Sequence, residues 1–282
     1  LRQGIGISST SIRPIKTSAT FLPERSFPMQ NPKNRFKSAI AKGTRQVGVW
    51  NTIGGNTVPE LLGGAGFDWV LVDCEHAAIE TIEVLPALQS NGQTPGTSAV
   101  VRVASHDATL FKRGVAMGAQ TVMVPYVQTA EEADAAVHAM RYGPQGMRGM
   151  AGMTRATRYG KVDNYCDVAE DELCLIVQVE TLAGLENLDA IAKTDGVDAV
   201  FIGPADLSAS MGLRGQMTHP DVVAAVSGAI KRLVELDVPA GVMALDPDVA
   251  DRYLALGATF VAVAVDLVVL ADAICDIRNR FS

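Results

Sequence analysis

Two acidic residues follow apolar segments that have the character of buried strands. Glu180 comes directly after Cys174–Val179 (CLIVQV), and Asp206 follows Ala199–Gly203 (AVFIG) by three residues. Such apolar runs are typical of strands that helices cover on both faces. Because the carboxyl ends of these strands meet at the ligand-binding edge of a barrel or open sheet, we expect both carboxylates in one crevice. Paired carboxylates suit hard divalent cations such as Mg²⁺ or Mn²⁺, with Co²⁺ as a further candidate.

Other polar residues stand at or near the ends of strand-like segments. Asp73 and His76 follow the second segment, Arg102 lies between two valines in the third, and Gln178 lies two residues before Glu180. A buried guanidinium needs a carboxylate partner or an anionic ligand. A histidine titrates near neutral pH, so His76 is a natural base, and Asp73 is placed to orient it.

Together these groups predict enolate chemistry on a 2-oxo acid. A cation on Glu180 and Asp206 can chelate the carboxylate and keto oxygens, and Arg102 can stabilise the negative charge that develops. Polarising the carbonyl makes the neighbouring methyl group acidic, so His76 can remove a proton. No lysine stands at a strand end in an apolar setting, which disfavours a Schiff base and a PLP cofactor.

The same residues also have plainer interpretations. Asp73 and Asp266 could simply cap the helices that follow them. His76 could be an ordinary loop histidine, and Gln178 a satisfied interior amide. Arg102 is the hardest to explain without a ligand, because its neighbours on the strand are apolar.

The elements that must position these residues alternate regularly from Val47 onward. The predicted strands are Val47–Trp50, Trp69–Val72, Ser98–Val103, Thr121–Val127, Leu173–Val179, Ala199–Ile202, Pro239–Ala244 and Phe260–Val265. The predicted helices are Asn31–Lys42, Thr57–Gly64, Ile79–Asn91, Ala108–Met117, Ala130–Arg141, Leu182–Lys193, His219–Leu236, Pro247–Leu256 and Leu267–Arg280. About eight strand–helix units predict a (β/α)₈ TIM barrel, with a doubly wound open sheet as the alternative. No GxGxxG follows the first strand, so no nucleotide cofactor is expected.

Glycines punctuate this pattern where helices should end. They are Gly66, Gly118, Gly196 and Gly257. One connection, Tyr142–Glu172, is long and contains five glycines together with Arg148, Arg155 and Arg158. It is either a solvated surface loop, or a lid or subunit-contact loop over a site that binds an anion.

Bulk composition narrows the class of protein. A chain of 282 residues with a net charge of −7 is long enough for one large domain, and its charge argues against nucleic-acid or anionic-membrane partners. No apolar run reaches the roughly 20 residues of a transmembrane helix. The four cysteines form no CxxC pair, so they predict no zinc site and fit a reducing cytoplasm.

The first residues differ from the rest of the chain. Residues 1–28 are rich in Ser, Thr, Arg and Pro, and their first acidic residue is Glu24. They contain no apolar core of a secretory signal. We therefore expect a loosely held or mis-assigned leader over residues 1–28 and a single barrel domain over residues 29–282, with Met29 as a plausible start.

Longer phrases around the candidate residues resemble one known family. The matching segments are ELLGGAGFDWVLVDCEHA (Glu60–Ala77), GAQTVMVPYVQTAEEA (Gly118–Ala133), RYGPQGMRG (Arg141–Gly149), VQVET (Val177–Thr181) and VFIGPADLSASMG (Val200–Gly212). With them the chain resembles the HpcH/HpaI family of class II, metal-dependent pyruvate aldolases, whose type activity is 4-hydroxy-2-oxo-heptanedioate aldolase. The resemblance covers nearly all of the chain after the leader.

This resemblance implies a reaction and most of the roles in it. Glu180 and Asp206 would bind the metal, and Gln178 and Arg102 would bind the pyruvyl group. The backbone N–H groups of Ala205 and Asp206 would contact the pyruvate carboxylate. The expected reaction is the reversible cleavage of a 4-hydroxy-2-oxo acid into pyruvate and an aldehyde, with decarboxylation of oxaloacetate as a side activity.

The resemblance also implies an acid/base and an assembly. His76, supported by Asp73, would transfer protons. The family fold is a barrel whose last helix swaps between subunits, usually in a homohexamer built as a trimer of dimers. This chain departs from the family at Cys74, where glycine is common, and at Ala116, where many members have an acidic residue. Both departures bear on the aldehyde rather than on the pyruvate half.

Two other functions remain as alternatives from the sequence. A CoA-thioester lyase of the citrate lyase β-subunit or malyl-CoA lyase type needs an adenine-nucleotide site, for which Arg148, Arg155 and Arg158 are the nearest basic group. The other alternative is a non-catalytic barrel that binds a small acid or serves an assembly role. The intact set of Glu180, Asp206, Arg102 and His76 argues against it.

Overall fold

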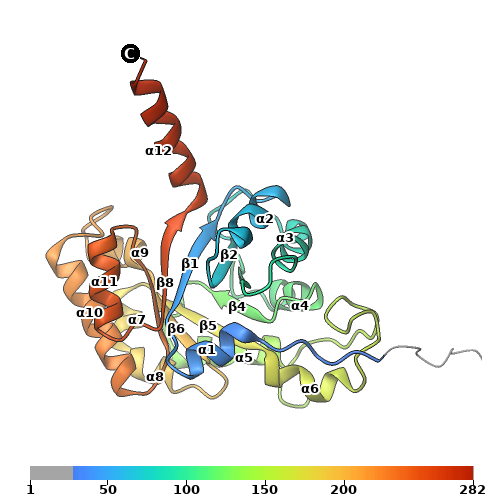
Figure 1. Cartoon of the computed structure of the whole chain (residues 1–282). Coiled ribbons are helices and arrows are strands. Elements are labelled where there is room, and N and C mark those ends of the chain that lie inside the picture. The colour runs from blue at the N-terminus through green and yellow to red at the C-terminus, as the bar shows by residue number, and fades with distance from the viewer. Residues whose placement is uncertain (1–27, 282) are drawn as a thin grey trace, which may run out of the picture.

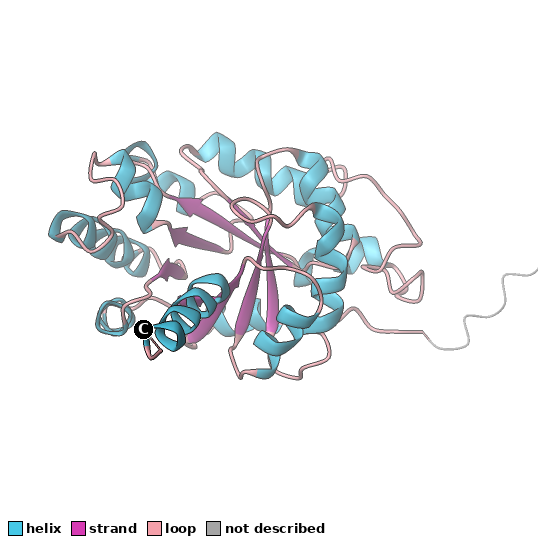
Figure 2. Ribbon diagram, turned by 90° about the horizontal axis from the view of Figure 1, so that it is seen from above, coloured by secondary structure: helices cyan, strands magenta, loops and turns pink. Residues whose placement is uncertain are grey.

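The computed structural model describes residues 28–281, in which eight parallel strands close into a barrel in chain order (Figure 1). The strands are β1 (Gln46–Asn51), β2 (Trp69–Asp73), β3 (Ser98–Arg102), β4 (Thr121–Val124), β5 (Cys174–Val179), β6 (Ala199–Ile202), β7 (Ala240–Met243) and β8 (Phe260–Val265). The barrel closes where β1 pairs with β8, and Figure 2 shows helices surrounding the strands. The predicted (β/α)₈ barrel is thus confirmed, and the open sheet is wrong.

The helices follow the predicted alternation with some differences. They are α1 (Arg35–Ala41), α2 (Thr57–Gly64), α3 (Val84–Asn91), α4 (Ala108–Ala116), α5 (Ala130–Met140), α6 (Tyr165–Glu172), α7 (Leu182–Glu186), α8 (Leu188–Ala192), α9 (Pro204–Ser210), α10 (Pro220–Glu235), α11 (Pro247–Ala255) and α12 (Asp266–Asn279). A 3₁₀ turn, Thr81–Glu83, precedes α3. Helix α1 begins later than predicted because the Asn34 side chain caps it by accepting from the Lys37 N–H.

Aromatic side chains fill the barrel interior, and glycines make room for them. A Cβ on Gly48 would lie 2.1 Å from the Trp69 ring, and one on Gly241 would lie 2.2 Å from the Phe260 ring. Phe36 of α1 packs edge-on against both rings, at centroid distances of 6.0 Å and 5.3 Å. Because Trp69 and Phe260 begin their strands, α1 closes the amino-terminal end of the barrel and leaves the carboxyl end for a site.

The predicted helix-ending glycines have the backbone that their position requires. Gly66, Gly118, Gly196 and Gly257 have φ angles of 90°, 96°, 95° and 103°, which L side chains rarely adopt. These turns return the chain from helix to strand and explain why the alternation was readable in the sequence.

About half of the residues in the long connection Tyr142–Glu172 are buried or half-buried, and the connection contains α6. Arg148 is buried, with its guanidinium 4.3 Å from the Tyr142 ring and 5.7 Å from the Tyr165 ring. The connection joins α5 to β5, so it lies at the amino-terminal end of the barrel. It therefore cannot be a lid over residues at the carboxyl ends of the strands of its own chain, and its exposed residues, including 143–145 and 149–153, fit the surface-loop interpretation.

The first and last described residues differ in how they contact the barrel. The predicted leader falls almost wholly on residues 1–27, which lie outside the described part, and the Met29 N–H donates to the Lys161 carbonyl at 2.9 Å. Helix α12 projects away from the barrel, and its apolar side chains are exposed (Figure 1). No helix within residues 28–281 is long and apolar enough to cross a membrane.

Candidate active site

The carboxyl ends of the strands bring five of the predicted site residues to one end of the barrel. Asp73 and Arg102 end β2 and β3 and stand opposite each other in the register. Gln178 lies near the end of β5, Glu180 directly follows it, and Asp206 lies in the first turn of α9, after β6. Parallel strands of a barrel end on the same face, which is why separate segments meet here.

Arg102 is buried, with 5% of its surface exposed, and several partners hold its guanidinium. Its Nε and Nη2 donate to the two carboxylate oxygens of Asp73 at 2.9 Å and 2.7 Å. Its Nη1 lies 2.8 Å from Glu75 Oε2 and 3.4 Å from Gln178 Oε1. The Trp50 ring packs against the guanidinium at 5.1 Å. Asp73 therefore holds the guanidinium through Nε and Nη2, while Nη1 points toward Gln178 of β5.

Asp73 has a different partner from the one the sequence suggested. Its oxygens bind Arg102, and Oδ1 also accepts from the backbone N–H groups of Glu75 and His76 at 3.0 Å and 3.3 Å. Burial alone would raise the pKa of Asp73, but the bonds to Arg102 outweigh it and hold that pKa below its usual range. Asp73 thus shapes the turn that carries His76 without orienting the imidazole.

His76 is the exposed group of this turn. Its side chain is 62% exposed, and its Nε2 lies 3.7 Å from Glu75 Oε1. Glu75 was not among the predicted site residues. It stands two residues after Asp73, and this spacing was a signal that both carboxylates could contact the same side chain. Burial raises the pKa of Glu75 more than the nearby Arg102 lowers it.

Glu180 is buried and held by two donors. Oε1 accepts from the Tyr126 backbone N–H at 2.8 Å, and Oε2 accepts from the Gln178 side-chain amide. Tyr126 has φ of 59°, a left-handed backbone that turns its N–H toward the carboxylate and that no sequence pattern signalled. Burial, and then the negative charge of Asp206, raise the pKa of Glu180 to about 7.

A close approach explains the glycine that follows β6. A Cβ on Gly203 would lie 2.3 Å from Glu180 Oε2 and 3.0 Å from Gln178 Nε2. Only glycine leaves room for both side chains to lie against this backbone. The glycine of the GPAD phrase therefore shapes the site, one turn before Asp206.

The donor set fits a divalent cation held by few protein ligands. The negative charge of Asp206 raises the pKa of Glu180, and neither carboxylate forms an ion pair with any residue in the described range. A cation between two such carboxylates would relieve their repulsion. No group of three or more His, Cys, Asp or Glu residues within 28–281 could hold a metal. Mg²⁺ commonly binds through one or two carboxylates and leaves positions for substrate and water.

Asp266 belongs to the scaffold rather than to the chemistry. It is the first residue of α12 rather than the cap that the sequence suggested. Its carboxylate accepts from the Asn51 amide at 2.7 Å, from the Thr52 N–H and hydroxyl at 2.9 Å and 2.7 Å, and from the Ile53 N–H at 3.1 Å. These bonds fasten the base of α12 to the end of β1.

Comparison with known proteins places this barrel among aldolases. A family model described as HpcH/HpaI aldolase/citrate lyase matches residues 46–273. The chain belongs to the HpcH/HpaI family. A pyruvate aldolase of Rhizobium etli is 48% identical over 254 residues, which cover 90% of this chain and all of the relative. A hydroxypyruvate/pyruvate aldolase of Sagittula stellata is 46% identical with the same coverage.

A solved HpcH/HpaI family structure has the same architecture. The aldolase/citrate lyase family protein of Burkholderia cenocepacia superposes with a TM-score of 0.84 at 33% identity, covering 88% of this chain and 99% of that one. Family membership makes the chain a lyase of the aldolase class. The cluster at the carboxyl ends of β2, β3, β5 and β6 is its candidate active site on the geometry described above.

Proposed function

We propose that the protein is a divalent-metal-dependent aldolase that cleaves a 4-hydroxy-2-oxo acid reversibly into pyruvate and an aldehyde. The observation that carries this proposal is the pair of Glu180 and Asp206 beside the fixed guanidinium of Arg102. The names of relatives at 48% and 46% identity, a pyruvate aldolase and a hydroxypyruvate/pyruvate aldolase, support pyruvate or a hydroxylated form of it as the donor.

In this proposal the metal is held by Glu180 and Asp206. Mg²⁺ or Mn²⁺ fits two carboxylates best, and Co²⁺ is a further candidate. When bound, the ion would act as a Lewis acid on the keto oxygen of the substrate. Gln178 donates to Glu180 and accepts from Arg102, and it would thereby hold the metal ligand and the guanidinium in fixed positions relative to each other.

The pyruvyl group would lie between β3 and α9. Arg102 offers Nη1 toward this space and stabilises negative charge on the enolate oxygen. The backbone N–H groups of Ala205 and Asp206 stand in the first turn of α9, where a helix makes no bonds of its own, and would receive the substrate carboxylate. This arrangement would orient pyruvate through its carboxylate and its keto oxygen and leave the methyl carbon accessible.

His76 would carry the proton. It removes the proton from the 4-hydroxyl group, the C3–C4 bond breaks, and the electron pair passes into an enolate of pyruvate as the aldehyde leaves. The same proton then returns to C3 to give pyruvate. Loss of carbon dioxide from oxaloacetate gives the same enolate, so we propose that decarboxylation is a side activity.

Assembly and location complete the proposal. The exposed apolar length of α12 supports packing against a second copy of the chain, in a homo-oligomer such as a trimer of dimers. All four cysteines are free, which supports a reducing cytoplasm as the site of action.

Hydrogen exchange at the pyruvate methyl group tests the reaction without knowledge of the aldehyde. The exchange in D₂O is followed by NMR with and without Mg²⁺ or Mn²⁺. Metal-dependent exchange that is lost in Glu180→Gln and in His76→Ala supports the proposal. If exchange occurs with neither metal, the aldolase proposal is contradicted, because aldol cleavage and decarboxylation both pass through the enolate.

A further inference from the structure

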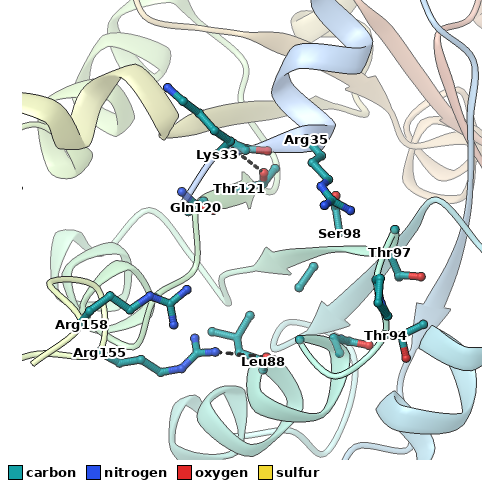
Figure 3. A pocket seen from close by; sticks show the side chains of 17 residues that line it. Lys33, Arg35, Leu88, Thr94, Thr97, Ser98, Gln120, Thr121, Arg155 and Arg158 are labelled. Carbon is teal, nitrogen blue, oxygen red and sulfur yellow. Dashed lines mark hydrogen bonds between the residues drawn. The ribbon is translucent and has the colours of Figure 1, made fainter. Parts of the chain in front are cut away.

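A cavity of about 290 Å³ lies at the end of the barrel opposite the candidate active site (Figure 3). Ser98 and Thr121, the first residues of β3 and β4, line it. Arg102 stands at the other end of β3. The cavity therefore shares strands with the candidate active site but none of its residues.

The charged side chains among the described lining residues of this cavity are all basic. Lys33, Arg35, Arg155 and Arg158 contribute to it, and no Asp or Glu is among its described lining residues. Lys33 is paired with Glu172 at 2.5 Å. The three arginines form no ion pair with any residue in 28–281, so their charges have no counterpart there. We call the space between Arg35, Arg155 and Arg158 the arginine pocket.

Arg155 is held in place by backbone and is partly buried. Its Nη1 donates to the Met117 carbonyl at 2.9 Å, and its Nη2 donates to the Leu88 carbonyl at 3.3 Å. A Cβ on Gly118 would lie 2.6 Å from Nη1, so the glycine leaves space for the guanidinium. Burial, and then the charge of Arg158, lower the pKa of Arg155, as expected for a cation without an anion beside it.

Arg158 is presented by an unusual backbone. Arg158 and Tyr159 have φ angles of 50° and 57°, a left-handed backbone that two successive non-glycine residues rarely adopt. Thr157 supports the turn, because its hydroxyl accepts from the Gly160 N–H at 3.0 Å. Figure 3 shows Arg155 and Arg158 reaching toward the cavity from one wall while Arg35 extends from another.

Neutral polar groups complete the lining. Asn91 is 1% exposed, and neither its amide nitrogen nor its oxygen has a hydrogen-bond partner among the described residues. Thr94 and Ser98 add hydroxyl groups, and no aromatic residue is among the described lining residues. The lining thus offers charge and hydrogen bonds but no surface on which a nucleotide base could stack.

We propose that the arginine pocket binds a small anion that carries one or more phosphate groups, such as a short phosphorylated metabolite or inorganic pyrophosphate. Planar guanidinium groups bind phosphate oxygens through two parallel bonds, and three of them converge on a space large enough for a phosphate with a few further atoms. Binding would tie α1, the start of β3 and the Tyr142–Glu172 connection together.

Calorimetric titration of inorganic pyrophosphate into the metal-free, full-length protein at fixed ionic strength tests this proposal. We expect one site per chain. The double variant Arg35→Gln/Arg158→Gln should bind at least about tenfold more weakly, because it loses two charge-assisted contacts to the anion. Neither side chain bonds to a described residue, so the variant should fold. Thr94→Glu, which adds a carboxylate to the lining, should also weaken binding.

Two control variants test whether binding is specific to the arginine pocket. Arg252→Gln removes one exposed charge on α11 and should leave the affinity unchanged. Arg102→Lys alters the candidate active site and should also leave it unchanged. Equal affinity in Arg35→Gln/Arg158→Gln, an equal loss in either control, or no binding of any of the phosphate probes by the unmodified protein would each overturn the proposal. Because no metal or turnover is involved, these outcomes are independent of the aldolase proposal.

Orthophosphate and a three-carbon phosphate ester, titrated separately, distinguish the sources of the anion. Tighter binding of the ester than of both orthophosphate and pyrophosphate assigns the pocket to a phosphorylated metabolite. Tighter binding of pyrophosphate than of the ester assigns it to an inorganic polyphosphate. Either result supports the shared phosphate chemistry, and failure of all three anions contradicts it.

Discussion

Arg102 and Asp73 form a two-point ion pair across neighbouring strands, with donor–acceptor distances of 2.9 Å and 2.7 Å. The pair fixes the plane of the guanidinium, and the remaining Nη1 faces Glu75 and Gln178. Charge that is fixed before the substrate arrives needs no reorganisation during the reaction, which is how such groups lower barriers.

Replacing Arg102 by Lys should show whether catalysis needs the planar guanidinium or only its positive charge. The ammonium group keeps the positive charge but cannot bond both Asp73 oxygens while it also faces Gln178. We expect kcat/KM for aldol cleavage to fall about 10²–10³-fold. Circular dichroism and metal titration serve as controls for folding and for the Glu180–Asp206 pair. A fully active variant would show that the guanidinium is structural.

Replacing Gly203 by Ala should disturb the proposed metal ligands without touching them. The new Cβ would lie 2.3 Å from Glu180 Oε2, so that carboxylate must move. We expect metal affinity to fall at least about tenfold, as changes next to a metal ligand typically cause, with the barrel still folded. Gly228→Ala on α10 is the matched control, because no atom lies within 4 Å of its Cβ. Equal metal affinity in both variants would contradict the assignment.

The raised pKa of Glu180 should make the stability of the metal-free protein depend on pH. Its value is raised from 4.5 to about 7 in the folded protein, so protons bind the folded state preferentially. The ionised form therefore costs stability, and this cost grows as pH rises from about 4.5 to about 7. The metal-free protein should lose thermal stability over that window relative to Glu180→Gln. Parallel melting curves of the two proteins over the same pH range would contradict the raised pKa.

Metal binding should show the complementary dependence. A cation requires ionised Glu180, so apparent affinity should fall as pH drops below about 7, by up to about tenfold per unit. Isothermal titration with Mn²⁺ at several pH values measures this. A pH-independent affinity between about 5.5 and 7 would show that Glu180 does not exchange its proton for the metal.

Much of the fold was predictable because its signals are local. Apolar strands and helix-ending glycines such as Gly118 and Gly257 act within a few residues, and the structure confirms their positions. Helix α6 was not predicted because the glycine-rich stretch before it has no helical periodicity. Helix α9 was not predicted because it is short and begins at Pro204, directly after a strand and its glycine.

The site was predictable in position but not in pairing. Strand ends in a barrel must meet, so Glu180 and Arg102 could be placed together from the sequence. The sequence could not show that Asp73 bonds Arg102 instead of orienting His76, because side-chain partners depend on register and rotamer. The arginine pocket could not be predicted from the sequence for the same reason, because Arg35 and Arg158 line one cavity only in the folded chain.

Helix α12 provides a test of the proposed assembly. Leu267, Val269, Ile274 and Ile277 are between 54% and 58% exposed, an apolar surface that a solvated helix would not usually carry. If this surface packs against a second copy, Ile274→Glu/Ile277→Glu should place charges in that interface and reduce the mass measured by light scattering to a smaller species. Arg278→Glu changes charge on the same helix and serves as the control. An unchanged mass in the double variant would show that the assembly, if any, does not depend on α12.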